Sequence, residues 1–227
     1  MNILCTVCVR AGSKGLKGKN FMKINNRYLI SYTLDVAIKS KLFTHIVVST
    51  DSRKIRALKK NYKKVDFIKR PKNLATDGAN KLDAIRHALK YSESINNLKY
   101  DLVFDLDATS ALRKLKDLEN ALKVFKNKHA ENLFSVNVSR KNPYFNMVEK
   151  KNGRIRVVKK LNRWPIRRQD APITYDMNAS IYIWKRKILL SSDNLFRKKT
   201  AIYVMDIERS IDVDSKFDLT MIKNLIN

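Results

Sequence analysis

The stretch ILCTVCVRAGSKGLKGKN, residues 3–20, decides the fold. Residues 3–9 are apolar and rich in β-branched side chains, which predicts a strand buried on both faces. Residues 10–20 then carry three of the chain's five glycines and four cations. Glycine lets backbone N–H groups approach an oxygen closely, and Lys and Arg supply the countercharge. A buried strand that runs into such a loop predicts a phosphate site in an α/β protein.

The loop matches neither of the two commonest phosphate-binding templates. A P-loop requires Gly-Lys followed by Ser or Thr, whereas Gly18-Lys19 is followed by Asn20. The dinucleotide fingerprint G-x-G-x-x-G also fails, because the three glycines are spaced three residues apart. The alternative interpretation is a solvated β-to-α turn in a lysine-rich protein.

Length and composition indicate one globular domain over residues 1–227. No stretch approaches the about 20 apolar residues of a membrane span, and residues 1–9 lack the layout of a signal peptide. We therefore expect a cytoplasmic protein without a membrane partner. Cys5 and Cys8, three apart on one strand, face opposite ways and are predicted to be core thiols rather than a disulfide or a zinc site.

The formal net charge of +27 raises the possibility of nucleic-acid binding. The lysines, however, are scattered along the whole chain, and they are not interleaved with aromatic residues that stack on bases. We therefore expect no specific nucleic-acid partner. The charge would still attract anionic substrates.

Strand and helix patterns alternate along residues 1–138, which predicts a mostly parallel, twisted sheet flanked by helices. Asp51 or Ser52 is expected to cap one helix, and Asp77 another. The predicted strands are residues 3–9, 45–50, 65–68, 101–107 and 133–138. The predicted helices are residues 29–40, 53–62 and 115–128, together with a helix that begins at Asp77 and continues through residue 89.

The rhythm changes at residues 139–175, which are irregular and polar, with three prolines and an apparent hairpin at 149–159. We interpret this stretch as an inserted arm. Regular structure is expected to resume at 179–184, 201–205 and 210–213, with a last helix from 215 or 216 to 226. His45, His87 and His129 are interpreted as structural.

Two acidic pairs stand at or near predicted strand ends. Asp105 and Asp107 form a D-x-D, the pattern with which some glycosyltransferases hold a nucleotide-sugar through a metal. Asp212 and Asp214 are also two residues apart, so on a strand both carboxylates would face one side and share a hard cation. The alternative for this second pair is that it caps the following helix.

Residues 10–16 with Lys19 and Asn20 resemble R-[GA]-G-S-K-G-[IL]-x-x-K-N, the signature of the acylneuraminate (CMP-sialic acid) cytidylyltransferases. Further matches follow in family order along the chain: 48–52, 70–77, Arg168-Gln169, 178–183 and the S-I-D-V-D of 210–214. Residues 107–113, DATSALR, resemble the family's Q-P-T-S-P-L-R but carry Asp107 in place of Gln and alanines in place of both prolines. Residues 142–146 and Asp107 are similar to members that act on legionaminic acid.

The resemblance implies a nucleotide-diphospho-sugar transferase-like fold whose arm, 139–175, reaches across a homodimer to complete the partner's site. It also implies the following roles for site residues. The residues expected to bind the nucleotide are Arg10, Ala11, Gly12, Ser13, Lys14, Lys19, Asn20 and Arg70. Those expected to bind the sugar are Asp107, Arg168 and Tyr182, and Mg²⁺ is expected to bind Asp212 and Asp214, with Asp107 as a third ligand. The expected catalytic residues are Arg10, Lys19, Asp107, Asp212 and Asp214.

For Arg168 the alternative is an exposed arginine in a basic arm, and for Tyr182 a core position in a strand. For Asp107 the alternative to metal binding is a contact with the sugar.

The expected function is a cytidylyltransferase that joins CTP to a nine-carbon 2-keto-3-deoxy sugar acid. Two alternatives remain open from the residues. One is a metal-dependent glycosyltransferase that uses Asp105 and Asp107, and the other is a basic module that binds polyanions.

Overall fold

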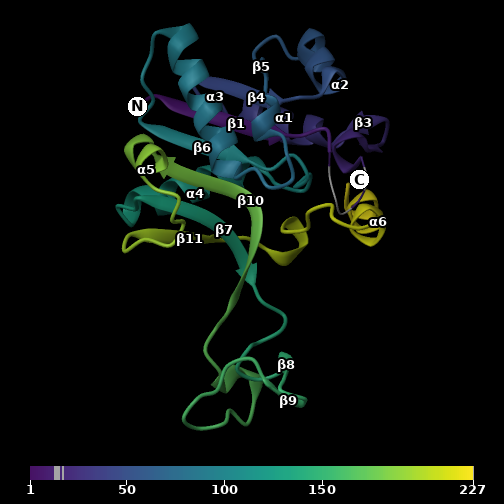
Figure 1. The fold of residues 1–227 in the computed structure, drawn as a ribbon, viewed down its shortest axis with the longest axis vertical. Helices are drawn as coiled ribbons and strands as arrows, with labels where there is room; N and C mark the ends of the chain where they lie inside the picture. Colours follow the sequence, from purple (N-terminus) through teal and green to yellow (C-terminus); the bar gives the residue numbers. More distant parts are fainter. Residues whose placement is uncertain (13–15, 17, 227) are drawn as a thin grey trace.

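A computed structural model describes residues 1–12, 16 and 18–226. Figure 1 shows a sheet with helices packed on it and an arm that projects from the body. The sheet has seven strands in the order β11-β7-β10-β6-β1-β4-β5. These strands are β1 (Ile3–Val9), β4 (His45–Thr50), β5 (Asp66–Lys69), β6 (Leu102–Leu106), β7 (Asn132–Val138), β10 (Tyr175–Lys185) and β11 (Thr200–Val204).

All neighbouring strands are parallel except at β10, which runs antiparallel to both β6 and β7. The predicted mostly parallel sheet is therefore confirmed. The helices are α1 (Leu29–Ser40), α2 (Arg53–Arg56), α3 (Lys81–Asn96), α4 (Leu115–Asn127), α5 (Arg186–Ser191) and α6 (Lys216–Leu225).

Alternation along β1 divides the core into two layers. Cys5, Val7 and Val9 pack with α1, α2 and α4, whereas Leu4 and Cys8 face α3 and α5. The two cysteines are free and lie on opposite faces, as the strand period predicts.

A third, smaller apolar cluster holds the C-terminal segment against the segment that follows the glycine-rich loop. Val213 and Ile222 pack there with Ile24 and Leu29, which belong to the hairpin of β2 (Lys23–Ile24) and β3 (Arg27–Tyr28) and to the start of α1. This packing brings residues 210–215 beside residues 16–24, although they lie at opposite ends of the sequence.

The predicted arm leaves the sheet between β7 and β10 (Figure 1). It carries the antiparallel hairpin of β8 (Val148–Lys151) and β9 (Arg154–Val157), which confirms the hairpin expected at 149–159. The pairing of β10 with β7 shifts register between Met177 and Tyr182, where Ala179 has a φ of 53°. This irregularity separates the half of β10 that pairs with both β6 and β7 from the half that pairs with β7 alone and leads to the arm.

Several boundaries differ from the sequence predictions. Asp77 does not cap α3; the side chain of Asn80 accepts a hydrogen bond from the Leu82 N–H and does so instead. Ser52 caps α2, which ends after four residues and continues as a 3₁₀ helix over 57–61.

The last part of the chain also departs from prediction. Residues 210–213 are not a strand, so the strand geometry expected for Asp212 and Asp214 is wrong. Helix α5, directly after β10, was not predicted. Among the described residues, no helix is both long enough and apolar enough to span a bilayer.

Candidate active site

A cleft of about 390 Å³ opens at the carboxyl ends of the central strands. Ligands in open α/β sheets bind at this edge. Of the predicted site residues that the structure describes, five line the cleft: Arg10, Lys19, Asn20, Arg70 and Asp107. The start of α3 forms another wall of the cleft, with Asn80 and Lys81.

The described part of the glycine-rich loop is held to the sheet by side chains at its ends. Asp51 accepts a hydrogen bond from the Ala11 N–H at 2.8 Å, so Asp51 anchors the loop. Asn20 Nδ2 donates to the Arg10 carbonyl at 2.8 Å. Gly18 has a φ of 74°, a conformation that glycine adopts without steric cost. Ser13 and Lys14 lie outside the described residues, and Gly12 is exposed.

Two arginines present positive charge to the cleft. Arg10 Nη1 donates to the Thr76 carbonyl at 2.8 Å and lies 3.1 Å from the Asp77 carboxylate. Arg70 is 5% exposed, and its guanidinium donates to Ser49 Oγ at 3.2 Å and to the Ser49 carbonyl at 2.8 Å. The backbone of β4 thus fixes Arg70 at the bottom of the site.

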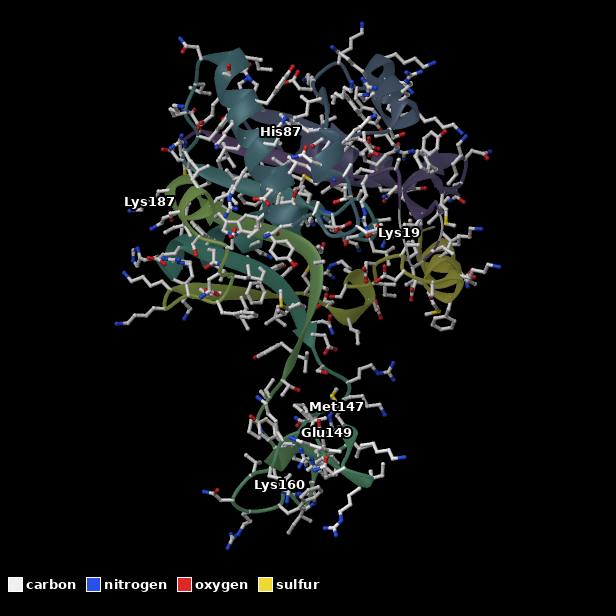
Figure 2. All side chains as sticks on the ribbon, in the orientation of Figure 1. Lys19, His87, Met147, Glu149, Lys160 and Lys187 are labelled. Atoms are coloured by element: carbon white, nitrogen blue, oxygen red, sulfur yellow. The ribbon has the colours of Figure 1, made fainter. Side chains whose placement is uncertain are left out.

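Lys19 and the C-terminal acidic pair meet on another side of the loop. Lys19 Nζ lies 2.5 Å from Asp214 Oδ1 (Figure 2 labels Lys19). Burial raises the pKa of Asp212 to about 6, helped by the negative charges of Asp214 and Asp107. Asp214 and Asp107 are thus both near enough to Asp212 to oppose its ionisation.

The alternative that Asp212 or Asp214 caps α6 is wrong. Ser215 is the N-cap, because its Oγ accepts a hydrogen bond from the Asp218 N–H, and Asp218 completes the capping box. Neither Asp212 nor Asp214 is therefore needed to begin the helix.

Asp107 is fixed at both of its carboxylate oxygens. Oδ2 lies 3.2 Å from Lys81 Nζ, and Oδ1 accepts hydrogen bonds from the N–H and the hydroxyl of Thr109 at 3.0 and 2.8 Å. Burial opposes ionisation, but Lys81 and these hydrogen bonds overcome it and lower the pKa of Asp107 well below its usual range.

The D-x-D of Asp105 and Asp107 does not have the geometry of an open metal site. Asp105 is fully buried, and its carboxylate is paired with Lys81 at 2.9 Å and with Thr6 Oγ1 at 2.8 Å. The glycosyltransferase alternative, which requires both carboxylates to face a metal, therefore loses its structural basis.

Tyr182 lies beside this cluster but not in the main cleft. It opposes Asp105 across β10 and β6, stacks on Trp184 with ring centroids 5.4 Å apart, and has Lys81 Nζ 5.4 Å from its ring centroid. Tyr182 lines a separate cavity of about 230 Å³ next to the cleft.

Arg168 lies in the arm, in a 3₁₀ turn over 168–170, and is not among the residues that line the cleft of its own chain. Its guanidinium donates to the Ser139 carbonyl at 2.6 Å. Of the predicted site residues that the structure describes, Arg168 alone lies in the arm.

Lys81 is the site residue that sequence reasoning missed. Its partners are 24 and 26 positions away, and the expected cap at Asp77 assigned Lys81 to an ordinary helical position. The only local signal for the position of Lys81 is Asn80 directly before it, a residue type that commonly caps the start of a helix. Arg113 lies beneath the site as well, because its Nη2 donates to the Asp107 carbonyl at 2.7 Å.

The mostly parallel sheet and its flanking helices form a fold shared with solved nucleotidyltransferases. A solved CMP:2-keto-3-deoxy-manno-octonic acid synthetase in complex with CTP superposes over 100% of this chain and 98% of its own, with a TM-score of 0.70 and 13% identity. A 4-diphosphocytidyl-2C-methyl-D-erythritol synthase covers 100% and 99%, with a TM-score of 0.71 and 9% identity. These similarities concern the fold alone.

The chain belongs to the cytidylyltransferase family, whose model matches residues 4–225. A CMP-N,N'-diacetyllegionaminic acid synthase of Campylobacter jejuni is 43% identical over 99% of this chain and 95% of its own length. The post-translational flagellin modification protein B of Campylobacter coli is also 43% identical, over 99% and 94%. An N-acylneuraminate cytidylyltransferase of Escherichia coli is 28% identical over 96% of this chain and 51% of its own length.

Proposed function

We propose that the protein transfers CMP from CTP to a nine-carbon 2-keto-3-deoxy sugar acid of the legionaminic or sialic type and releases pyrophosphate. The observation that carries this proposal is the convergence of Arg10, Lys19, Asn20, Arg70 and Asp107 on one cleft at the carboxyl ends of β1, β5 and β6. The relatives named for CMP-legionaminic acid and N-acylneuraminate support the class of the second substrate.

In this reaction the anomeric hydroxyl of the sugar acid attacks the α-phosphorus of CTP, and pyrophosphate leaves. The chain contributes mainly by orienting the two substrates and by neutralising phosphate charge. Arg10 and Lys19 provide cations at the cleft, while Arg70 is held rigidly by Ser49. No histidine lines the described part of the cleft, so we assign no histidine as the base.

Mg²⁺ is proposed to bind at Asp212 and Asp214. In the described part of the chain no three His, Cys, Asp or Glu side chains lie together as a ready cation site. Mg²⁺, however, is commonly held by one or two carboxylates together with substrate phosphates and water. Burial and the neighbouring charges of Asp214 and Asp107 raise the pKa of Asp212, and a cation bound here would offset both. When bound, Mg²⁺ would favour ionisation of the attacking hydroxyl and neutralise phosphate oxygens.

The arm is proposed to be a homodimer contact that carries Arg168 to the sugar site of the partner subunit. The arm exposes many apolar side chains, which is unfavourable for a surface left in water. They are Met147, Val148, Ile155, Val158, Leu161, Trp164, Ile166 and Ile173. Figure 2 shows that Met147 and Glu149 lie in the arm, apart from Lys19 in the body. We also propose a cytoplasmic location, where CTP is made.

The arm proposal predicts that light scattering at micromolar concentration gives twice the chain mass of 26.4 kDa. Trp164→Asp combined with Ile166→Asp should give monomers with much less activity, because both the apolar contact and the proximity of Arg168 are lost. Phe217→Asp, at an exposed apolar residue of α6, is the control and should remain dimeric. A fully active monomer would contradict the proposal.

The function is tested by incubating the protein with CTP, Mg²⁺ and a panel of eight-carbon and nine-carbon sugar acids, with pyrophosphate release as the readout. We expect release with acylated nine-carbon acids and little with the eight-carbon acid. Release with none of them would overturn the proposed function. Release with the eight-carbon acid alone would overturn the nine-carbon substrate class.

A further inference from the structure

Lys81 occupies the wall between two cavities. It lines both the cleft of about 390 Å³ and the neighbouring cavity of about 230 Å³ that contains Tyr182. Its backbone is fixed because Asn80 caps the first turn of α3, in which Lys81 is the first residue. The ammonium group therefore points from a rigid helix end toward the end of β6.

Lys81 Nζ bridges the two carboxylates at the end of β6. It lies 2.9 Å from Asp105 Oδ2 and 3.2 Å from Asp107 Oδ2. The second oxygen of each carboxylate is held separately, that of Asp105 by Thr6 and that of Asp107 by Thr109. Lys81 is thus the ion-pair partner that the two carboxylates share.

The bridge makes the two carboxylates unequal. Asp105 is fully buried, whereas the side chain of Asp107 is 26% exposed and lines the larger cleft. Without Lys81, two neighbouring carboxylates would repel each other, and a buried unpaired charge is strongly destabilising. With Lys81, Asp105 serves as a buried counterion and Asp107 is left as the carboxylate that meets a ligand.

Resting on the function proposed above, we propose that Lys81 is a positioning residue that holds Asp107 as a hydrogen-bond acceptor for an O–H or N–H group of the sugar acid. An ionised carboxylate only accepts hydrogen bonds, whereas the glutamine of the family pattern both accepts and donates. Asp107 with Lys81 therefore selects sugar acids that offer a donor at this point. Because Lys81 Nζ lies 3.2 Å from Asp107 Oδ2, a metal cation at Asp107 would meet a like charge, so the pair favours a sugar contact over the metal role for Asp107.

The test is a double-mutant cycle of Lys81→Met and Asp107→Asn, with the KM for each substrate and kcat measured separately. Each single change should raise the KM for the sugar acid by about tenfold or more and the KM for CTP by less than about threefold. The double variant should be no worse than the more impaired single variant, because Lys81 acts through Asp107. Lys81→Arg, which keeps the charge, should recover part of the loss.

Two further variants separate positioning from folding. Lys99→Met is the matched control, since Lys99 also pairs with a buried carboxylate, Glu93 at 3.2 Å, but lies outside the site; its kinetics should equal those of the unmodified protein. If Lys81→Met fails to fold, the cycle is carried out with Asp105→Asn in every member, which removes the buried charge that Lys81 would leave unpaired.

Three outcomes would overturn the inference: additive effects in the cycle, an unchanged KM for the sugar acid, or a rise mainly in the KM for CTP. The last would instead assign Lys81 to the nucleotide. These results are distinct from failure of the proposed function, which would be seen as no pyrophosphate release by the unmodified protein with any sugar acid.

Discussion

Asp214→Asn is expected to lower kcat by on the order of a thousandfold, which corresponds to about 4 kcal/mol of transition-state stabilisation. The substitution preserves shape and removes one of the two carboxylates proposed to bind Mg²⁺. Asp214 is exposed, and its ion pair with Lys19 contributes little to stability, so the variant should fold normally. Added Mg²⁺ should rescue little activity.

A melting curve supplies a readout of metal binding that does not depend on turnover. Ligands that bind only the folded state stabilise it, so Mg²⁺ should raise the Tm of the unmodified protein and leave that of Asp214→Asn almost unchanged. Ser215→Ala, which removes the adjacent helix cap, is the control. It should lose about 1 kcal/mol of stability and remain active. An Asp214→Asn variant with near-normal kcat and an intact response to Mg²⁺ would contradict the metal role.

Lys19→Ala is expected to raise the KM for CTP by tenfold or more. A charge-assisted contact from a largely buried lysine to phosphate is worth about 1.5–3 kcal/mol, and 1.4 kcal/mol is a factor of ten. Initial rates at varied CTP with saturating sugar acid measure the effect. Lys19→Arg should be less impaired than Lys19→Ala, because the positive charge is kept.

The control for Lys19 is Lys23→Ala. Lys23 is exposed and lies over the ring of Tyr28, outside the cleft, so its loss should leave the KM for CTP unchanged. If Lys19→Ala also leaves both KM and kcat unchanged, Lys19 is not part of the nucleotide site.

The elements that could be predicted from sequence are those whose signals are local. The continuous apolar run of β1 and the glycines that follow it sufficed to predict a buried strand and a loop at the sheet edge. The arm was recognisable because a long polar stretch with prolines is unusual inside a compact domain. The expected cap at Asp77 failed because two acceptable cap residues lie three positions apart, and Asn80 is the one used.

The parts that could not be predicted depend on contacts between distant segments. The alternation of Asp212 and Asp214 suggests a strand, but residues 210–213 have no strand partner in the described structure. Their position is instead determined by Val213, which packs with Ile222 in the third apolar cluster. Likewise, nothing in the sequence indicates which lysine of so basic a chain lies between Asp105 and Asp107. The fold alone determines that it is Lys81.

The most direct test of the proposed chemistry follows the α-phosphorus of CTP. The protein is incubated with CTP labelled at the α-phosphate, Mg²⁺ and an acylated nine-carbon sugar acid, and the products are separated and identified by mass. Transfer of CMP predicts that the label appears in a CMP-sugar in amounts equal to the unlabelled pyrophosphate released. Label found only in CMP or CTP, with no labelled sugar product, would contradict the proposed transfer.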